Sequence, residues 1–182
     1  MAVVYLNNAA TTYPKPQAVI DATLDALTGP PGGVDRSVDA EADERPLPRG
    51  RAIIGRFLGA SQPESITFSS GATESLNLVI YSLVERDRSV VTTVTEHNSV
   101  LRPLERMRRE RNARVVPVTC DQRGYVDPSA VAHAIDDSTA CVVVNHGSNV
   151  TGAVQDIHAI AAICRERAVP LVVDAAQTVG HV

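Results

Sequence analysis

From about residue 64 onward, short β-branched runs alternate with longer amphipathic stretches. The runs are SITF, SVVTTV, RVVPV, ACVVVN and PLVVD, and the helix-like stretches between them lie near residues 73–85, 98–112, 128–136 and 156–167. Strands that are apolar at nearly every position are typical of a parallel sheet that is covered on both faces. The pattern therefore predicts an α/β fold, with a doubly wound, mostly parallel sheet and helices on both faces.

The first 60 residues do not follow this alternation. A helix-like stretch from about residue 16 to 28 precedes the turn-rich TGPPGGVDRSVDAEADERPLP, whose prolines and glycines disfavour regular structure. A second helix is expected to follow and to end near Gly59. We expect residues 1–60 to form an N-terminal arm with helices and an irregular loop, and residues 61–182 to form the sheet domain.

Composition and charge exclude several classes of protein. With 44% hydrophobic and 21% charged residues, the 182-residue chain suits a globular fold rather than disorder. A formal charge of -4 gives no overall attraction to nucleic acid or anionic lipid, and the basic cluster at residues 102–114 has the spacing of a solvated helix face. The chain contains neither an apolar run of roughly 18 residues nor a signal peptide pattern. We expect a cytoplasmic protein that binds neither nucleic acid nor membrane.

Cysteine and lysine, two residues that often carry chemistry, are scarce. Cys120, Cys141 and Cys164 are widely separated and form no C-x-x-C pair, so structural thiols are favoured over metal ligands or nucleophiles, and no metal site is expected. Of the 17 basic residues only Lys15 is a lysine. A mechanism that needs a lysine must use Lys15 or take one from elsewhere.

Polar or small residues stand where four of the expected strands end. SSGATES follows SITF, TEHNS follows SVVTTV, and HGSNVTG follows ACVVVN, which itself ends in Asn145. The last run, PLVVD, ends in Asp174. Ligands bind beyond the carboxyl ends of the strands in open parallel sheets, so these segments are expected to converge there. This convergence is the main signal for a binding site.

The first two of these segments each have two readings. Residues 69–73 lead into a helix, where free backbone N–H groups and the helix dipole favour an anion such as phosphate. The same residues also suit an ordinary Ser/Thr cap with Glu74 in the first turn. His97, just past a strand, is either a satisfied loop residue or a ring that contacts a ligand.

The later segments carry amide and acidic side chains. The residues concerned are Asn145, His146, Asn149, Gly152, Asp174 and Gln177. The loop residues suit contacts to a ligand, although the same residue types form plain turns. Asp174 lies at the tip of an apolar strand, where a buried carboxylate needs a cationic or hydrogen-bonding partner, and a protonated cofactor nitrogen would suffice.

The combined set of groups matches one cofactor better than the others. Pyridoxal 5'-phosphate has an anion, an aromatic ring, a phenolate oxygen and a pyridinium nitrogen that makes the ring an electron sink. A G-x-G-x-x-G after a strand and a G-x-x-x-x-G-K-[ST] are both missing from the sequence, so NAD and P-loop binding lack their motifs. Nucleotide binding rests on fold analogy alone.

Five motifs resemble, in order and spacing, the N-terminal half of class V aminotransferase-fold enzymes, and the nearest branch is that of cysteine desulfurases and selenocysteine lyases. They are YLNNAATTYPKP, FSSGATESLNL, TEHNSVLRPLE, NHGSNVTGAVQDIHAIAAICRE and VVDAAQTVGHV. The resemblance covers nearly the whole chain except residues 29–50. It implies part of the large domain of a fold type I transferase that depends on pyridoxal 5'-phosphate, without the small C-terminal domain.

The resemblance implies roles for residues around the cofactor. Ala72 and Thr73 would bind its phosphate. His97 would stack on the pyridine ring and would be the catalytic residue of this chain. Asp174 would pair with the ring nitrogen.

Two further groups of residues receive implied roles. Asn149 and Gln177 would lie near the phenolic oxygen of the cofactor. Asn8, Ala9 and Ala10 would line the side where the carboxylate of the amino-acid substrate binds.

The resemblance also implies parts that this chain lacks. In the family a segment of the type S-x-H-K beyond the aspartate carries the Schiff-base lysine, and this chain ends before it. The small domain carries the arginine that grips the substrate carboxylate and the cysteine that receives sulfur. Lys15, between two prolines in the N-terminal arm, is a poor substitute, and Asn7 stands where the family usually has an acid.

Four hypotheses remain open at this point. The chain is part of an enzyme that acts on an amino acid, with cysteine giving alanine and sulfur, as a homo-oligomer or a hetero-oligomer, and a second chain or a missing segment supplies the lysine. Alternatively, it is an inactive module that binds pyridoxal 5'-phosphate or another protein. It is otherwise a fragment without a function of its own, or a nucleotide-binding domain.

Overall fold

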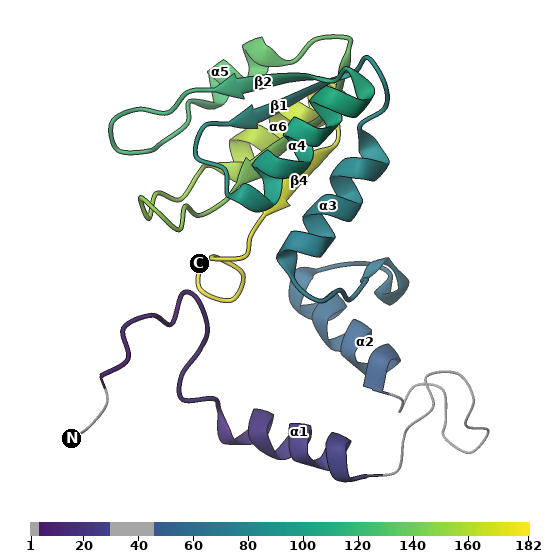
Figure 1. Cartoon of the computed structure of the whole chain (residues 1–182), viewed down its shortest axis with the longest axis vertical. Helices are drawn as coiled ribbons and strands as arrows, with labels where there is room; N and C mark the ends of the chain where they lie inside the picture. Colours follow the sequence, from purple (N-terminus) through teal and green to yellow (C-terminus); the bar gives the residue numbers. More distant parts are fainter. Residues whose placement is uncertain (1–3, 30–45) are drawn as a thin grey trace. The chain divides into compact units, whose positions relative to one another are not determined.

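The computed structural model describes residues 4–29 and 46–182, which belong to two compact units, Met1–Phe68 and Ser69–Val182 (Figure 1). Most of the irregular loop expected over residues 29–50 lies outside the described residues. Among the described residues, no helix is long and apolar enough to cross a membrane.

The first unit contains helices α1 (Gln17–Thr28) and α2 (Pro46–Leu58) and the short 3-10 helix η2 (Pro63–Ser65). The irregular loop was expected to extend past Pro46, but α2 begins there. Prolines in a first helical turn cost little, because the N–H groups at that end have no helical acceptor in any case. Residues 46–50 are therefore helical, contrary to the expectation from their prolines.

A second correction concerns the segment SITF, which does not form the strand expected of it. Ser65 belongs to η2, Ile66 has an extended backbone, and residues 66–69 take part in no strand pairing. An extended segment becomes a strand only where a neighbour takes its backbone hydrogen bonds, and the described residues offer this segment none. Its β-branched composition was therefore not sufficient to predict a strand.

The second unit is built on a parallel sheet. Its strands are β1 (Ser89–Thr93), β2 (Arg114–Val118), β3 (Thr139–Asn145) and β4 (Leu171–Asp174), in the order β2-β1-β3-β4. The helices are α3 (Ala72–Leu83), α4 (Asn98–Arg111), α5 (Pro128–Ala134) and α6 (Ile157–Glu166). These bounds lie close to the ranges expected from the sequence, and the α/β prediction is confirmed.

Alternate residues of the central strands enter two separate cores, one on each face of the sheet. Val90 of β1 packs with residues of α3 and α4, whereas its neighbour Val91 packs with residues of α5 and α6. Because successive side chains of a strand point to opposite faces, both faces of β1 must be apolar. Figure 1 shows the helices distributed over the two faces. The near-continuous valines of the sequence are explained by this double covering.

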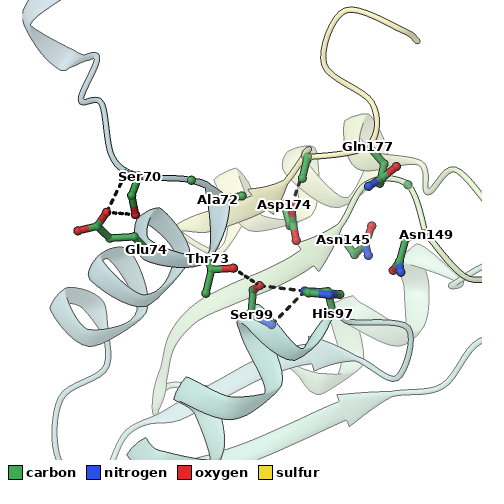
Figure 2. A pocket seen from close by; sticks show the side chains of 13 residues that line it. Ser70, Ala72, Thr73, Glu74, His97, Ser99, Asn145, Asn149, Asp174 and Gln177 are labelled. Atoms are coloured by element: carbon green, nitrogen blue, oxygen red, sulfur yellow. Dashed lines mark hydrogen bonds between the residues drawn. The ribbon is translucent and has the colours of Figure 1, made fainter. Parts of the chain in front are cut away.

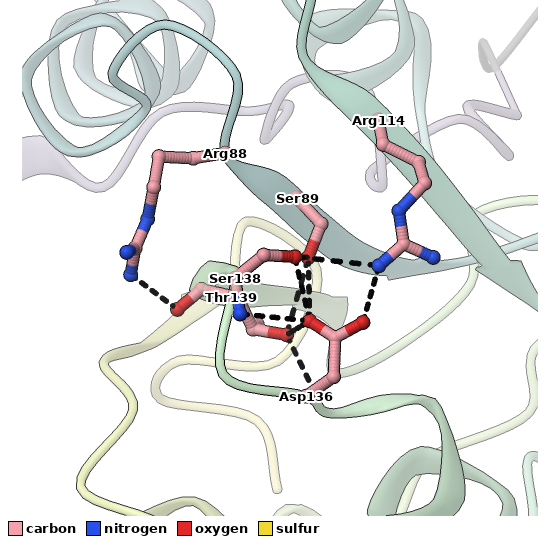
Figure 3. A network of polar contacts seen from close by, with 6 residues as sticks. All are labelled: Arg88, Ser89, Arg114, Asp136, Ser138 and Thr139. Atoms are coloured by element: carbon pink, nitrogen blue, oxygen red, sulfur yellow. Dashed lines mark hydrogen bonds and ion pairs between the residues drawn. The ribbon is translucent and has the colours of Figure 1, made fainter.

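A polar network holds the amino ends of the strands (Figure 3). Asp136, just before β3, accepts hydrogen bonds from the Ser138 hydroxyl at 2.6 Å and the Ser138 backbone N–H at 3.0 Å, and it forms an ion pair with Arg114 at the start of β2. The hydrogen bond from the Ser138 hydroxyl contributes most, and Arg114 contributes less, to a pKa of Asp136 that is lowered to about 2. The network ties β2 to β3 at the edge opposite the candidate site.

The strand order fixes where a ligand can bind. From β1 the chain moves outward to β2 and then returns to the other side of β1 to form β3, so the direction of winding reverses between β1 and β3. Loops from neighbouring strands diverge at such a reversal and leave a crevice beyond the carboxyl ends. The fold therefore predicts a site that includes the residues after β1 and β3.

Candidate cofactor site

A pocket with a volume of about 300 Å³ lies at this position in the second unit (Figure 2). It is lined by residues 70–74, His97, Ser99, Asn145, Gly147, Asn149, Asp174, Ala176 and Gln177. These residues come from the start of α3, the start of α4 and the segments that follow β3 and β4. The convergence of strand-end segments expected from the sequence is thus present in the fold.

The start of α3 is held by Glu74 of its own first turn and presents backbone N–H groups to the pocket. One carboxylate oxygen of Glu74 accepts hydrogen bonds from the backbone N–H of Ser70 at 2.8 Å and from its hydroxyl at 2.7 Å, and these bonds lower the pKa of Glu74. The N-cap residue is Gly71, which has no side chain to cap the helix, and Glu74 of the first turn binds back to Ser70. The helical hydrogen bonds begin only with the N–H of Glu74 to Gly71, so the N–H groups of Ala72 and Thr73 have no acceptor within the helix. Both residues line the pocket, where these donors suit an anion.

His97 is the N-cap residue of α4 and is held by Ser99. Its Nδ1 accepts the backbone N–H of Ser99 at 3.1 Å, and the Ser99 hydroxyl lies 2.9 Å from the same nitrogen. An Nδ1 that accepts an N–H carries no proton, so the proton of the neutral ring is on Nε2. The Ser99 hydroxyl also contacts the Thr73 hydroxyl at 2.7 Å, which links the starts of α3 and α4. The ring of His97 therefore has a defined orientation in the pocket (Figure 2).

Asp174 ends β4 and is 8% exposed. Its Oδ1 accepts the backbone N–H of Ala176 at 3.0 Å, and its backbone carbonyl accepts the N–H of His146. Asp174 is in register with Asn145 of the adjacent parallel strand, so the two side chains share a face of the sheet. Figure 2 shows both side chains at the pocket, which gives it a carboxylate beside an amide.

Asn149 and Gln177 line the pocket from the loops that follow β3 and β4. The two loops approach each other closely, because a Cβ atom built on Gly147 would lie 2.5 Å from the Cγ2 atom of Thr178. The Ser148 hydroxyl accepts the N–H groups of residues 150 and 151, both at 3.2 Å, which fixes the turn around Asn149. His146 and Gly152, which the sequence also suggested, are not among the residues that line the pocket.

Glu96 is a buried acid that was not singled out from the sequence. It is 7% exposed, and its Oε1 accepts hydrogen bonds from the Thr93 hydroxyl at 2.7 Å and the Asn145 backbone N–H at 2.8 Å. Burial, together with a smaller contribution from the charge of Asp174, raises the pKa of Glu96 to about 7 despite these bonds. The available signal was its place in TEHNS, between an apolar strand and His97. Ser99 was likewise missed, because an isolated serine in a helix start is common.

Three buried polar atoms near this edge have no hydrogen-bond partner among the described residues. They are Thr92 Oγ1, Glu96 Oε2 and Asn145 Oδ1. Buried polar atoms are nearly always satisfied, and an orphaned one at a pocket suggests a ligand or a bound water. Of these three residues, Asn145 also lines the pocket. Anion donors, an oriented ring, amides and a carboxylate fit the polar groups of pyridoxal 5'-phosphate.

Residues 4–182 match the family model described as Aminotransferase class-V. The chain belongs to the class-V aminotransferase family. Enzymes of this family, cysteine desulfurases among them, depend on pyridoxal 5'-phosphate. The donor set of the pocket agrees with that cofactor.

Cysteine desulfurases recur among the relatives of this class-V aminotransferase chain. It is 36% identical to the cysteine desulfurase IscS of Neisseria meningitidis over 98% of its own length and 45% of that protein. It is 35% identical to a probable cysteine desulfurase of Methanothermobacter thermautotrophicus, again over 98% of this chain and 44% of the relative. The chain therefore spans about 45% of the length of these curated relatives.

Solved structures show the same partial correspondence. The apo cysteine desulfurase of Thermococcus onnurineus NA1 superposes with a TM-score of 0.87 at 30% identity, over 98% of this chain and 45% of that one. SspA in complex with cysteine gives a TM-score of 0.86 at 28% identity, over 96% and 51%. The class-V aminotransferase chain corresponds to about half of each of these proteins.

The substrate-side residues expected from the resemblance, Asn8, Ala9 and Ala10, belong to the first unit. The side-chain oxygen of Asn8 accepts the backbone N–H of Tyr13 at 3.0 Å. Lys15, in the same unit, donates to the Thr11 hydroxyl and the Thr12 carbonyl, both at 2.7 Å. The role of Asn8, Ala9 and Ala10 stays a prediction, as do the individual roles of the pocket residues in this class-V aminotransferase chain. Among the described residues, no group of three or more potential metal ligands lies together.

Proposed function

We propose that this chain forms the pyridoxal 5'-phosphate-binding part of a cysteine desulfurase-like enzyme. In the overall reaction, L-cysteine and an acceptor thiol give L-alanine and a persulfide, so one sulfur atom is transferred and no external oxidant is needed. The observation that carries the proposal is the convergence of the α3 N-terminus, His97 and Asp174 on one pocket. The similarity to cysteine desulfurases supports the choice of substrate.

In this proposal each residue of the pocket binds a different group of the cofactor. The N–H groups of Ala72 and Thr73 bind the phosphate, and the His97 ring stacks on the pyridine ring. The Asp174 carboxylate holds the proton on the ring nitrogen by pairing with it. Bound pyridoxal 5'-phosphate then supplies an electron sink for bond breaking at the substrate α-carbon.

The amide side chains and the first unit complete the arrangement. Asn149 and Gln177 contact the phenolic oxygen and keep the ring from rotating. Asn8, Ala9 and Ala10 face the substrate carboxylate. Metal ions have no part in this scheme.

The lysine that holds the cofactor covalently is proposed to come from outside these 182 residues. Lys15 is the only lysine of the sequence, and its ammonium group is committed to Thr11 and Thr12. A Schiff-base lysine must present an unprotonated amine to the cofactor, whereas the Lys15 ammonium group donates its hydrogen bonds to two oxygens of its own segment. We propose a cytoplasmic homo-oligomer, in which a segment outside these 182 residues supplies this lysine, the substrate-binding arginine and the sulfur-accepting cysteine, or a hetero-oligomer, in which a second chain supplies them.

Cofactor binding can be tested with the purified chain. Adding pyridoxal 5'-phosphate is expected to give a saturable change in the absorbance of the cofactor, and pyridoxal, which lacks the phosphate, is expected to bind at least tenfold more weakly, which is about 1.4 kcal/mol. Equal binding of the two compounds would contradict the role of the α3 N-terminus. The absence of saturable binding at millimolar concentrations would contradict the proposal itself.

Borohydride reduction followed by intact mass measurement tests the source of the lysine. The chain alone, incubated with the cofactor, is expected to remain unmodified, and protein isolated from its source is expected to carry the reduced cofactor on a lysine outside these 182 residues, in the same or in a co-purifying polypeptide. A cofactor adduct on Lys15 would show that the chain uses its own lysine. Saturable cofactor binding without any such partner would favour the inactive cofactor-binding module.

A further inference from the structure

Glu96 bridges the turn after β1 and the end of β3. The last paired residues of β1 and β3 in the sheet register are Thr92 and Val143, so the backbone N–H of Asn145 lies beyond this ladder. The Glu96 side chain supplies the acceptor instead, with Oε1 2.8 Å from that nitrogen. The same oxygen accepts the Thr93 hydroxyl, which fixes the side chain from the strand behind it.

Two short connections extend from this bridge into the pocket. On one side, Glu96 is followed directly by His97, whose ring is fixed by Ser99. On the other side, Asn145 is paired in register with Asp174, and the next residue of the loop donates its N–H to the Asp174 carbonyl. The Glu96 side chain therefore connects, through short contacts, the residue proposed to stack on the pyridine ring and the residue proposed to pair with its nitrogen.

We infer that Glu96 is a positioning residue that fixes the turn carrying His97 to the end of β3 and thereby sets the His97 ring relative to Asp174. This inference deepens the proposed function and rests on it for the identity of the ligand. Glu96 does not line the pocket, so its action is through its neighbours and not by contact with the cofactor.

The protonation of Glu96 is consistent with this role. A charged Glu96 would add a second carboxylate next to Asp174, and with a pKa of about 7 the group is largely protonated below neutral pH. A protonated Glu96 leaves the negative charge of this part of the site on Asp174, where a pyridinium nitrogen requires it. The titratable neighbours of the group are Asp174, from β4, and His97, from the turn before α4.

Two substitutions distinguish the effect of the Glu96 hydrogen bond to Asn145 from the effect of the Glu96 charge. Glu96→Ala removes the acceptor of the Asn145 N–H, whereas Glu96→Gln keeps an acceptor oxygen in a neutral side chain that resembles the protonated acid. The matched control is Glu166→Gln, at the exposed end of α6. Binding of pyridoxal 5'-phosphate and the NMR resonance of the His97 ring in the cofactor-free chain are the two measurements.

We expect Glu96→Ala to shift the His97 resonance and to weaken cofactor binding about tenfold, because the His97 ring is no longer held in place relative to Asp174. Glu96→Gln is expected to keep both close to the wild-type values at pH 6, and Glu166→Gln is expected to change neither. Because Glu96→Ala can unfold the chain, Glu96→Gln provides a second test. A folded Glu96→Gln protein with a clearly shifted His97 resonance would overturn the inference, because this variant keeps the acceptor oxygen.

The outcomes also separate this inference from the proposed function. If no variant and no wild-type protein binds the cofactor, the proposed function fails, while the His97 resonance still reports on the bridge. If folded Glu96→Ala leaves both the resonance and the affinity unchanged, the positioning role is wrong and the proposed function stands.

Discussion

Asp174 and Asp156 show how much the position of a single carboxylate decides. Each accepts a backbone N–H two or three residues later, at 3.0 Å for Asp174 and 2.9 Å for Asp156. Asp156 is the exposed N-cap of α6, whereas Asp174 is buried at the pocket. A buried carboxylate needs a partner of opposite charge, and in the proposed function the pyridinium nitrogen is that partner.

The first prediction concerns the charge of Asp174. Asp174→Asn keeps an oxygen for the Ala176 N–H but removes the charge, so affinity for pyridoxal 5'-phosphate should fall by about one to two orders of magnitude, as expected when one partner of a buried charge pair is lost. Titration of the absorbance of the cofactor measures the effect. Asp156→Asn, which preserves the helix cap, should bind like the wild type. Comparable affinity of the two variants would argue against an Asp174–nitrogen pair.

The second prediction concerns pH and stability. The pKa of Glu96 is raised from 4.5 to about 7 in the folded chain, so between these values the folded state binds a proton that the unfolded state has lost. Stability from this group is full below about pH 4.5 and is lost as the pH rises through about 7, with a total on the order of 2–3 kcal/mol. Urea unfolding at pH 5 and pH 8 should show this loss in the wild type and not in Glu96→Gln. Equal pH dependence of the two proteins would contradict it.

At the residue scale, sequence patterns found the groups that face outward from strand ends and missed those that support them. Asn149, Asp174 and His97 stand in polar segments after apolar runs, which is a visible pattern. Glu96 and Ser99 act through contacts that depend on the register of β1 against β3 and of α3 against α4. That register results from packing across long stretches of chain, and no local spacing encodes it.

At the scale of elements, the loops after β3 and β4 depend on the lack of a side chain at Gly147. Its Cβ would lie 2.5 Å from the Thr178 methyl group, and Thr178 is 3% exposed and cannot swing into solvent. Gln177 is next in the chain, so movement of Thr178 displaces a pocket residue. Close packing of small residues thus sets the shape of the pocket.

The third prediction is that Gly147→Ala lowers the free energy of unfolding by about 1–3 kcal/mol, the usual cost of overpacking, and weakens cofactor binding. Gly55→Ala in α2 is the control, because its Cβ would meet its nearest atom at 3.7 Å and alanine favours a helix. Urea denaturation and cofactor titration measure the two effects. A Gly147→Ala protein as stable as the wild type would show that the loops adjust freely.

Elements were predicted well where both faces of a strand are buried and poorly where pairing decides. Valines lie on both faces of β1 and β3 because helices cover both faces of the sheet, and this produces a continuous apolar run in the sequence. SITF also consists largely of β-branched and aromatic residues, but no described strand pairs with it. Strand pairing is a long-range property, so composition cannot supply it.

At the scale of the whole molecule, the site and the stabilising network of the second unit lie at opposite edges of one sheet. The pocket lies beyond the carboxyl ends of the strands, and the Asp136 network lies at the amino ends. The Asp136 network can therefore be changed without altering a residue of the pocket. This separation allows the two to be measured apart.

The fourth prediction is that pyridoxal 5'-phosphate stabilises the chain through the pocket edge alone. At a concentration 100 times its dissociation constant, a ligand of the folded state adds about 2.7 kcal/mol, which raises the melting temperature of a chain of this size by roughly 5–10 °C. Hydrogen exchange with and without the cofactor should show added protection in residues 70–74, 145–149 and 174–177. Residues 136–139 at the opposite edge serve as the internal control. A raised melting temperature without added protection in residues 70–74, 145–149 and 174–177 would mean that the cofactor binds elsewhere.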